Sequence, residues 1–388
     1  MQAYFLNILP CVILLTIVVM LVNVALAEIL HRIILKDFYK NGSSQEASQK
    51  MKYLGYAYIF VTLVLMVVVG YYLIPLLAEI ISRFIAILVP FLYILVIRVG
   101  SSVIFSRTYK VLHVHNETIK EIVWEELRNL LFFLIPIFIM SYVVAFFAYF
   151  TSRTGIEISI WLFGLFVVLN MFATHMPNPY IYKFLLRAVP IKDDSAKQII
   201  KDTFEKHDMK KIPVYQFPFK KDAIAFVVGF TRIFMSDYLI TVLLKEELEA
   251  IIVHEIAHVK NYHLWKEVFI NLIFSFAAIT LIYGMEIIEY RFDFYVPELL
   301  NIVTGFFPLL LNGLFVSPMV SRIHERQADE YVLKSGIEPE TLILALEKII
   351  SSDDRERLMS NLEEKFSTHP SLENRIKYIN EFAKSMVK

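Results

Sequence analysis

Two histidines four residues apart are the residues of this sequence with the clearest chemical potential. They lie in the segment His254-Glu255-Ile256-Ala257-His258, for which the sequence predicts a helix. Side chains four positions apart project from the same face of a helix, so both imidazoles can reach one ion while Glu255 approaches it from the side. This pattern is typical of a zinc site in which a glutamate serves as the general base.

A catalytic zinc needs a third protein ligand and an open position for water. The single cysteine, Cys11, lies within an apolar run, so the third ligand is expected to be a histidine or a carboxylate. The metzincin class is excluded because its longer motif needs glycine and histidine at the positions of Asn261 and Leu264. His263 is expected to point off the ligand face of the helix. The third ligand should therefore come from another part of the chain.

The segment Glu325-Arg326-Gln327-Ala328-Asp329 offers the best third ligand. It follows directly on an apolar segment, and if the last two apolar segments form a hairpin, Glu325 returns to the membrane face that carries the two histidines. Asp329, one helical turn further on, is placed to accept the second N–H of a ligand histidine and to fix its tautomer. His324 is a weaker candidate because it faces another side of the same helix.

The composition indicates a membrane protein. Apolar residues make up 57% of the 388 residues, and charged residues make up 20%, against about 45 to 50% and about 25% in ordinary globular proteins. The 38 basic residues balance the 38 acidic ones, so no net charge favours nucleic acid as a partner. Seven apolar segments are long enough to cross a lipid bilayer, and they span residues 4–30, 56–77, 84–105, 130–150, 158–176, 268–288 and 299–320.

These segments divide the chain into an N-terminal membrane domain with five helices, residues 1–176, and a second domain, residues 177–388, that carries the zinc motif and includes helices six and seven. The loops after helices one and three are rich in lysine and arginine, whereas the alternate loops hold one basic residue each. The positive-inside rule then places the N-terminus outside. It also places residues 177–266 and the tail from residue 321 on the cytoplasmic side.

The polar part of the second domain predicts a small α+β fold. Residues 191–207 have helical spacing, residues 212–217 form a short strand, and residues 223–235 form a β-rich run that Gly229 divides into a hairpin. A helix then leads through the zinc motif towards helix six. The tail predicts a helix over residues 339–350 and a last helix that starts at Pro370-Ser371. The fold class is thus a mostly α membrane protein with a small α+β domain.

Three motifs resemble those of the integral-membrane gluzincins, which include type I CAAX prenyl endopeptidases and the HtpX proteases. The first runs from Glu246 to His258 and continues with Asn261 and His263. The second is Ser321-Arg322 followed by Glu325 to Asp329, and the third is Thr368-His369-Pro370 with Arg375. Five N-terminal helices favour the CAAX-type branch, since HtpX-like members have two helices before the zinc motif.

The resemblance implies a zincin-type catalytic domain with one zinc ion per chain. In this family the ligands correspond to His254, His258 and Glu325, the base to Glu255, and the groups that stabilise the oxyanion to His369 and Arg375. The resemblance also implies that the strand from Ile224 through Ala225 to Gly229 pairs with an extended substrate. Here the chain departs from the family pattern, because Ile224 replaces the usual asparagine.

The expected function is that of a membrane-embedded zinc endopeptidase that hydrolyses peptide or protein substrates, prenylated or inserted in the bilayer, in the manner of a CAAX prenyl protease. One alternative is an HtpX-like protease that degrades misfolded membrane proteins. Another is a polytopic transporter. An ion path would need charged residues at the centres of the helices, and predicted helices one, four, five and seven lack them.

Overall fold

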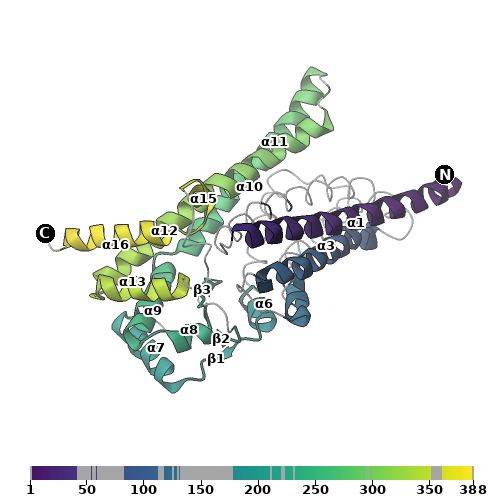
Figure 1. Ribbon diagram of the computed structural model, residues 1–388. Coiled ribbons are helices and arrows are strands. Elements are labelled where there is room, and N and C mark those ends of the chain that lie inside the picture. Colours follow the sequence, from purple (N-terminus) through teal and green to yellow (C-terminus); the bar gives the residue numbers. More distant parts are fainter. Residues whose placement is uncertain are drawn as a thin grey trace. The chain divides into compact units, whose positions relative to one another are not determined.

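The computed structural model describes residues 2–41, 54, 58, 83–111, 118–124, 126–128, 131, 178–209, 212–219, 223–229, 232–293, 295, 297–350 and 361–386 (Figure 1). The chain forms two compact units, Met1–Ile137 and Phe138–Lys388. Predicted helices two, four and five lie outside the described residues except for Tyr58 and Leu131, and so does the predicted domain boundary after residue 176. Three described helices are long and apolar enough to cross a membrane, at Ile17–Lys40, His263–Phe292 and Val303–Lys334, so the count of seven helices is not confirmed.

The first unit contains two long apolar helices, α1 (Gln2–Asn41) and α3 (Arg83–Val111), which pack against each other. They correspond to predicted helices one and three. Ala27 of α1 and Ile104 of α3 are buried at their contact. His31 Nδ1 lies 2.6 Å from Thr108 Oγ1, so a polar pair also links the two helices.

The second unit holds a four-stranded sheet in the order β1-β2-β4-β3. The strands are β1 (Val189–Pro190), β2 (Val214–Phe217), β3 (Ala225–Val228) and β4 (Arg232–Ser236). Strands β3 and β4 form the antiparallel hairpin that the sequence predicts, and β2 pairs with β4 in parallel. Because β4 lies between β2 and β3, strand β3 is an edge of the sheet.

A central buried helix, α9 (Lys245–Lys260), carries the predicted zinc motif. It packs against α7 (Asp194–Lys206), α12 (Ser317–Lys334), α13 (Pro339–Ile350) and β3, and is therefore covered on several sides. The Leu244 main-chain N–H donates to Glu247 Oε2 at 2.7 Å and caps the start of α9. Lys348 of α13 donates to both oxygens of the buried Glu247, at 2.7 and 2.6 Å. These bonds fix the N-terminal end of α9.

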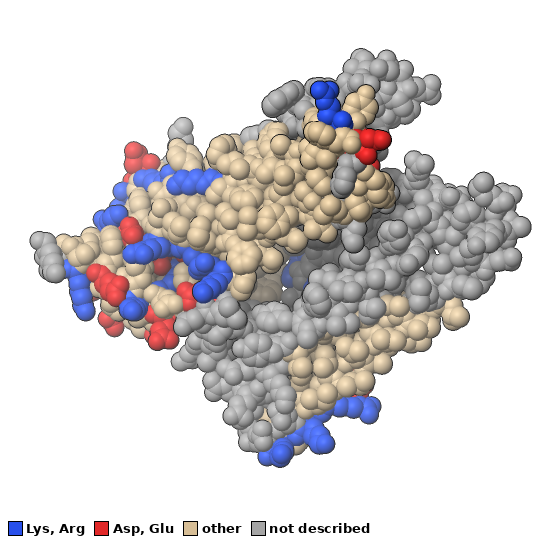
Figure 2. All heavy atoms as spheres, turned by 90° about the horizontal axis from the view of Figure 1, so that it is seen from above, with Lys and Arg blue, Asp and Glu red and all other residues tan. Residues whose placement is uncertain are grey.

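The last two apolar segments form the predicted helical hairpin. The first is α10 (His263–Phe292); the second is α11 (Glu298–Leu311), which continues through a π-helical turn, η1 (Asn312–Val316), into α12. Helices α10 and α11 pack against each other, and Asn312 Nδ2 donates to Asn271 Oδ1 at 2.6 Å. Figure 2 shows a broad surface without charged side chains along this hairpin, with charged residues gathered at its ends, as a helix pair in lipid requires.

Four short or terminal elements complete the described part of the second unit. They are α6 (Asn178–Leu185), α8 (Asp237–Val242), α15 (Asn361–Phe366) and α16 (Leu372–Met386). The predicted helix over residues 339–350 is observed as α13, and the predicted last helix is observed as α16, which starts directly after Ser371. Helices α12 and α16 pack against each other, so the C-terminal helix returns to the helix that carries Glu325.

Candidate metal centre

Three predicted ligand atoms converge between α9 and α12. His254 Nε2 lies 3.1 Å from His258 Nε2 and 3.4 Å from Glu325 Oε2, and His258 Nε2 lies 3.6 Å from Glu325 Oε1. In a tetrahedral site with bonds of about 2.1 Å, neighbouring ligand atoms are about 3.4 Å apart. The three side chains therefore have the spacing of three corners of a tetrahedral metal site.

Asp329 is in contact with the far nitrogen of the first histidine, as the sequence predicts. His254 Nδ1 lies 3.1 Å from Asp329 Oδ1, off the direction of an ideal hydrogen bond, and no other described group satisfies this buried nitrogen. We assign the Nδ1 proton to this contact because a buried carboxylate attracts it. The lone pair of His254 is then on Nε2, the atom that faces the other two ligands.

A second chain of contacts fixes the tautomer of His258, and the sequence did not predict it. His263 Nε2 lies 3.0 Å from Gln327 Oε1, an acceptor, so this nitrogen carries the proton. His263 Nδ1 is then an acceptor and lies 3.0 Å from His258 Nδ1, which must donate. The lone pair of His258 is therefore on Nε2. When His254 is neutral, two imidazole lone pairs and one carboxylate oxygen thus face a common point, which is an environment suited to a cation.

The pKa values of the two histidines also favour a bound cation. Burial lowers the pKa of His258 to about 3, so this ring is neutral and ready to act as a ligand. Burial also acts to lower the pKa of His254, but its close contacts with the Asp329 and Glu325 carboxylates outweigh that effect and raise it to about 10. Without a metal ion, a proton on His254 balances the buried carboxylates, and a metal ion at the three ligand atoms would take over that role.

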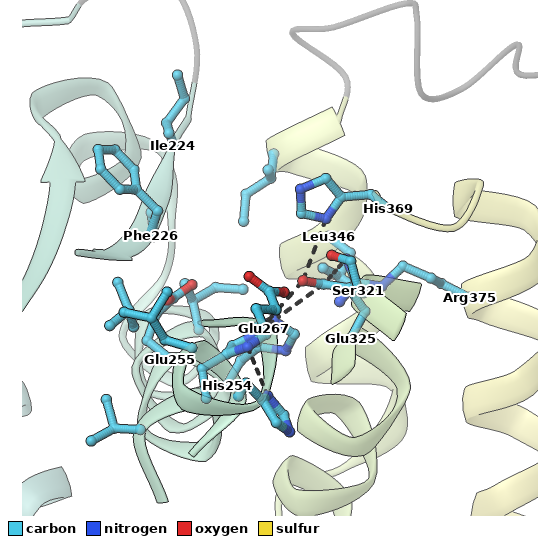
Figure 3. Close-up of a pocket in the computed structure, with 18 of the residues that line it drawn as sticks. Ile224, Phe226, His254, Glu255, Glu267, Ser321, Glu325, Leu346, His369 and Arg375 are labelled. Carbon is cyan, nitrogen blue, oxygen red and sulfur yellow. Dashed lines mark hydrogen bonds and ion pairs between the residues drawn. The ribbon is translucent and has the colours of Figure 1, made fainter. Parts of the chain in front are cut away.

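Glu255 projects into a cavity of about 720 Å³ beside these ligands. Burial raises the pKa of this carboxyl to about 7. Figure 3 shows Glu255 and His254 at the floor of the cavity, with Ile224 and Phe226 on one side and His369 on the other. A carboxylate beside a set of metal-ligand atoms, in a cavity open to substrate, is the arrangement that hydrolysis by an activated water requires.

The two predicted oxyanion groups also reach the centre, with different contacts. His369 Nδ1 lies 3.4 Å from Glu325 Oε1, and 46% of its side chain is exposed. Arg375 is buried and donates through Nε and Nη2 to both oxygens of Asp329, at 3.0 and 2.6 Å. Its Nη1 lies 3.5 Å from Glu325 Oε2. The guanidinium therefore holds the ligand carboxylate and the histidine-orienting carboxylate together.

Among the described strands, none pairs with the outer edge of β3, and this edge lies in the same cavity. Ser236 N donates to Ile224 O at 2.8 Å, so by the antiparallel alternation the main-chain groups of Phe226 and Val228 also point to β4. Those of Ala225 and Val227 then point away from β4. Residues 223–227 and Gly229 line the cavity. Ile224 contributes a side chain to the cavity wall, while its own N–H donates to Ser236 Oγ at 3.0 Å.

Comparison with known proteins supports this picture. The model of the peptidase family M48 matches residues 190–383, half of the chain, and this range contains every predicted site residue. The crystal structure of Ste24p from S. mikatae resembles the fold with a TM-score of 0.59, covering 95% of this chain and 97% of that chain at 17% sequence identity. No curated protein sequence matches the chain with significance.

Proposed function

The chain belongs to peptidase family M48, a family of metallopeptidases, and from this we propose that it is a membrane-bound zinc endopeptidase of the CAAX prenyl protease type. The observation that carries the proposal is the convergence of three ligand atoms of His254, His258 and Glu325 beside Glu255. Two histidines and one carboxylate are a ligand set of catalytic zinc sites. We assign one zinc ion per chain to these residues.

A zinc ion held there would polarise the scissile carbonyl and lower the pKa of a bound water to about 7. The residues of the chain carry out the proton transfers. Glu255 accepts the proton of the attacking water and then delivers it to the leaving amine, so one carboxyl serves both as base and as acid. Burial raises the pKa of this carboxyl to about 7 without a metal ion, and a bound cation would lower it and so favour the carboxylate form that accepts the proton.

His369 is the better placed of the two predicted oxyanion groups. Its ring is half exposed to the cavity, whereas the Arg375 guanidinium is committed to Asp329 and Glu325. We propose that His369 donates to the developing oxyanion and that Arg375 acts by orienting Glu325. A donor aimed at the position where charge develops is worth much more there than in water.

An extended substrate is proposed to pair with the outward main-chain groups of Ala225 and Val227, with Ile224 and Gly229 flanking this edge. Main-chain pairing binds a peptide with little regard to its sequence, and pockets for side chains add specificity. Ile224, in place of the family's asparagine, offers the substrate an apolar side chain and no side-chain hydrogen bond.

The substrate strand can be tested with Ala225→Pro. This change removes one outward N–H at a sheet edge, where proline is tolerated, and one lost hydrogen bond predicts a rise in KM of about tenfold. Steady-state cleavage of a model peptide measures the effect, with metal content as a check on folding. Ala225→Ser keeps the N–H and should have the wild-type KM. An unchanged KM in Ala225→Pro would place the substrate along another edge.

The substrate class is proposed to be prenylated or otherwise membrane-associated proteins. The likeness to Ste24p extends over nearly the whole chain, including the part before residue 190, and a long N-terminal membrane part is the feature that distinguishes the CAAX-type branch from the HtpX-like one. Cleavage of one model peptide with and without a prenyl group tests the proposal. Strong preference for the prenylated peptide is expected. Equal rates would favour the HtpX-like alternative, a quality-control protease.

The transporter alternative receives no support from the described part of the chain. The family match and the convergence of a complete ligand set with a base both indicate hydrolysis. The buried charged residues Glu325, Asp329 and Arg375 belong to the metal centre or orient its ligands.

We propose that the protein crosses the membrane several times, with the catalytic part in the cytoplasm and the N-terminus outside. Helix α10 has 30 residues, a length of about 45 Å, and leads from the metal centre to Asp293 at its other end. In a variant that lacks Cys11, cysteines at the exposed positions Lys201 and Asp293 should react differently with an impermeant thiol reagent on intact cells. We expect labelling at Asp293 alone, and labelling at Lys201 alone would invert the topology.

A further inference from the structure

Arg322 makes an unusual set of hydrogen bonds with the main chain of a distant segment. Its Nη1 donates to the carbonyl oxygens of Glu364, Lys365 and Ser367, at 2.8, 3.0 and 2.7 Å. These carbonyls belong to the last turn of α15 and the residue after it, where a helix leaves carbonyl groups without partners. A cation at a helix C-terminus is favourable because it satisfies these groups and complements the helix dipole.

The segment that Arg322 holds leads directly to His369. Helix α15 has only six residues, too few to be stable without tertiary contacts. Beyond it, the His369 main-chain N–H donates to Ser367 Oγ at 3.2 Å. On the other side, Ser371 Oγ and Asn374 Nδ2 donate to Glu364 Oε2, at 3.0 and 2.6 Å, and tie α15 to the start of α16. The loop from Ser367 to Pro370 is thus fixed at both of its ends.

Arg322 shares one face of α12 with two residues of the metal centre. Glu325 lies three positions after it and Asp329 seven, a spacing that aligns side chains along a helix. Along this face, α12 carries Arg322, which anchors the loop, and Glu325, which is a proposed metal ligand. It also carries Asp329, which pairs with Arg375 of α16. The position of the His369 ring relative to the ligand carboxylate, 3.4 Å away, is therefore set from a single rigid helix.

We propose that Arg322 is a positioning residue that holds His369 over the metal centre. Among the described residues, no carboxylate pairs with Arg322, and its hydrogen bonds go to main-chain carbonyls. Its contribution is therefore the geometry of the loop and not the neutralisation of a charge in the site. This inference rests on the proposed role of His369 as the donor to the oxyanion.

The test is a double-mutant cycle of Arg322→Met with His369→Ala in the full-length protein, measured by cleavage of a model peptide. Loss of one oxyanion donor costs about 10²- to 10³-fold in kcat, so Arg322→Met should lower kcat by about 30- to 100-fold while KM changes by less than about threefold. In the His369→Ala background, the same change should cost less than about threefold, because the residue through which it acts is gone. Arg322→Lys, which keeps a cationic donor, should recover most of the loss.

A second readout does not depend on activity. Amide hydrogen exchange of residues 361–371 should be at least about tenfold faster in Arg322→Met, while exchange in α13 should stay at the wild-type rate. Arg326→Met is the matched control, since Arg326 lies on the same helix but stacks over Tyr378, 4.0 Å from its ring centre. It should leave both exchange in this segment and kcat unchanged.

The results for the variants of Arg322 and His369 separate the positioning role from the oxyanion role. The proposal is overturned if Arg322→Met has wild-type kcat, or if the loss of kcat is equal in the presence and absence of His369. It is also overturned if Arg322→Met loses the metal, because Arg322 would then support Glu325. If His369→Ala itself has wild-type kcat, the proposed role of His369 fails. If His369→Ala is impaired and Arg322→Met is not, the positioning role alone fails.

Discussion

Replacing Glu255 with glutamine should reduce peptide hydrolysis by at least about 10³-fold while the protein keeps its metal. The substitution preserves the size of a side chain that is buried beside His254 and lines the cavity. It removes the proton acceptor, and general acid and base catalysis contributes about 10²- to 10⁴-fold. The upper part of that range is expected because one carboxyl is proposed to act in two successive proton transfers. Single-turnover cleavage of a model peptide, together with metal analysis, measures both parts of the prediction.

Glu267→Gln is the matched control for this experiment. Glu267 lines the same cavity, and its carboxylate lies 3.5 Å from His324 Nδ1 instead of the ligand atoms. The same chemical change at this second carboxylate should therefore alter the rate by less than about tenfold. A Glu255→Gln protein with activity within about tenfold of wild type, or an inactive Glu267→Gln protein, would show that another group is the base.

The centre of the site could be predicted from the sequence because local geometry determines it. A helix of 3.6 residues per turn places His254 and His258 on one face whatever surrounds it. Glu325 required one further step, the assumption that two apolar segments form a hairpin, and α10 and α11 confirm that assumption. Asp329 followed from Glu325, since one helical turn separates them on α12.

His263 could not be predicted as an orienting residue because its place depends on a turn. A continuous helix would carry it off the ligand face, and on that basis the sequence excluded it as a ligand. In the structure, α9 ends at Lys260, and Tyr262 adopts a left-handed conformation with φ of 54°. This turn returns His263 to His258, where it acts as a hydrogen-bond partner of the ligand. Left-handed conformations of tyrosine have no signature in the sequence.

The sequence also did not predict where the last membrane helix ends. The apolar run that predicts helix seven stops at residue 320, but the helix continues to Lys334. An apolar window measures the length of chain that suits hydrocarbon, whereas α12 continues because its next turns pack against α9 and α16. The metal ligand of this helix therefore lies on a continuation that hydropathy alone does not detect.

His258→Ala should leave the purified protein with close to no bound zinc, where the wild type holds one equivalent. Loss of a group that merely orients a ligand already weakens metal binding by about 10- to 100-fold, and the removal of the ligand itself should cost more. The two remaining ligand atoms, His254 Nε2 and Glu325 Oε2, lie 3.4 Å apart and would have to hold the ion alone. Metal analysis of the protein after dialysis gives the stoichiometry directly.

His324→Phe separates loss of a ligand from general disturbance of the histidine cluster. The His324 ring is buried and stacks on His263, with ring centres 4.1 Å apart and planes at 7°, and phenylalanine preserves that stack. Since His324 contributes no atom to the ligand set, this variant should keep a full equivalent of zinc. A His258→Ala protein that retains its zinc would contradict the ligand assignment, and so would a His324→Phe protein that loses it. The opposite behaviour of two histidines that both contact His263 would identify the side chains that bind the ion, because both substitutions alter the same cluster and only one removes a converging lone pair.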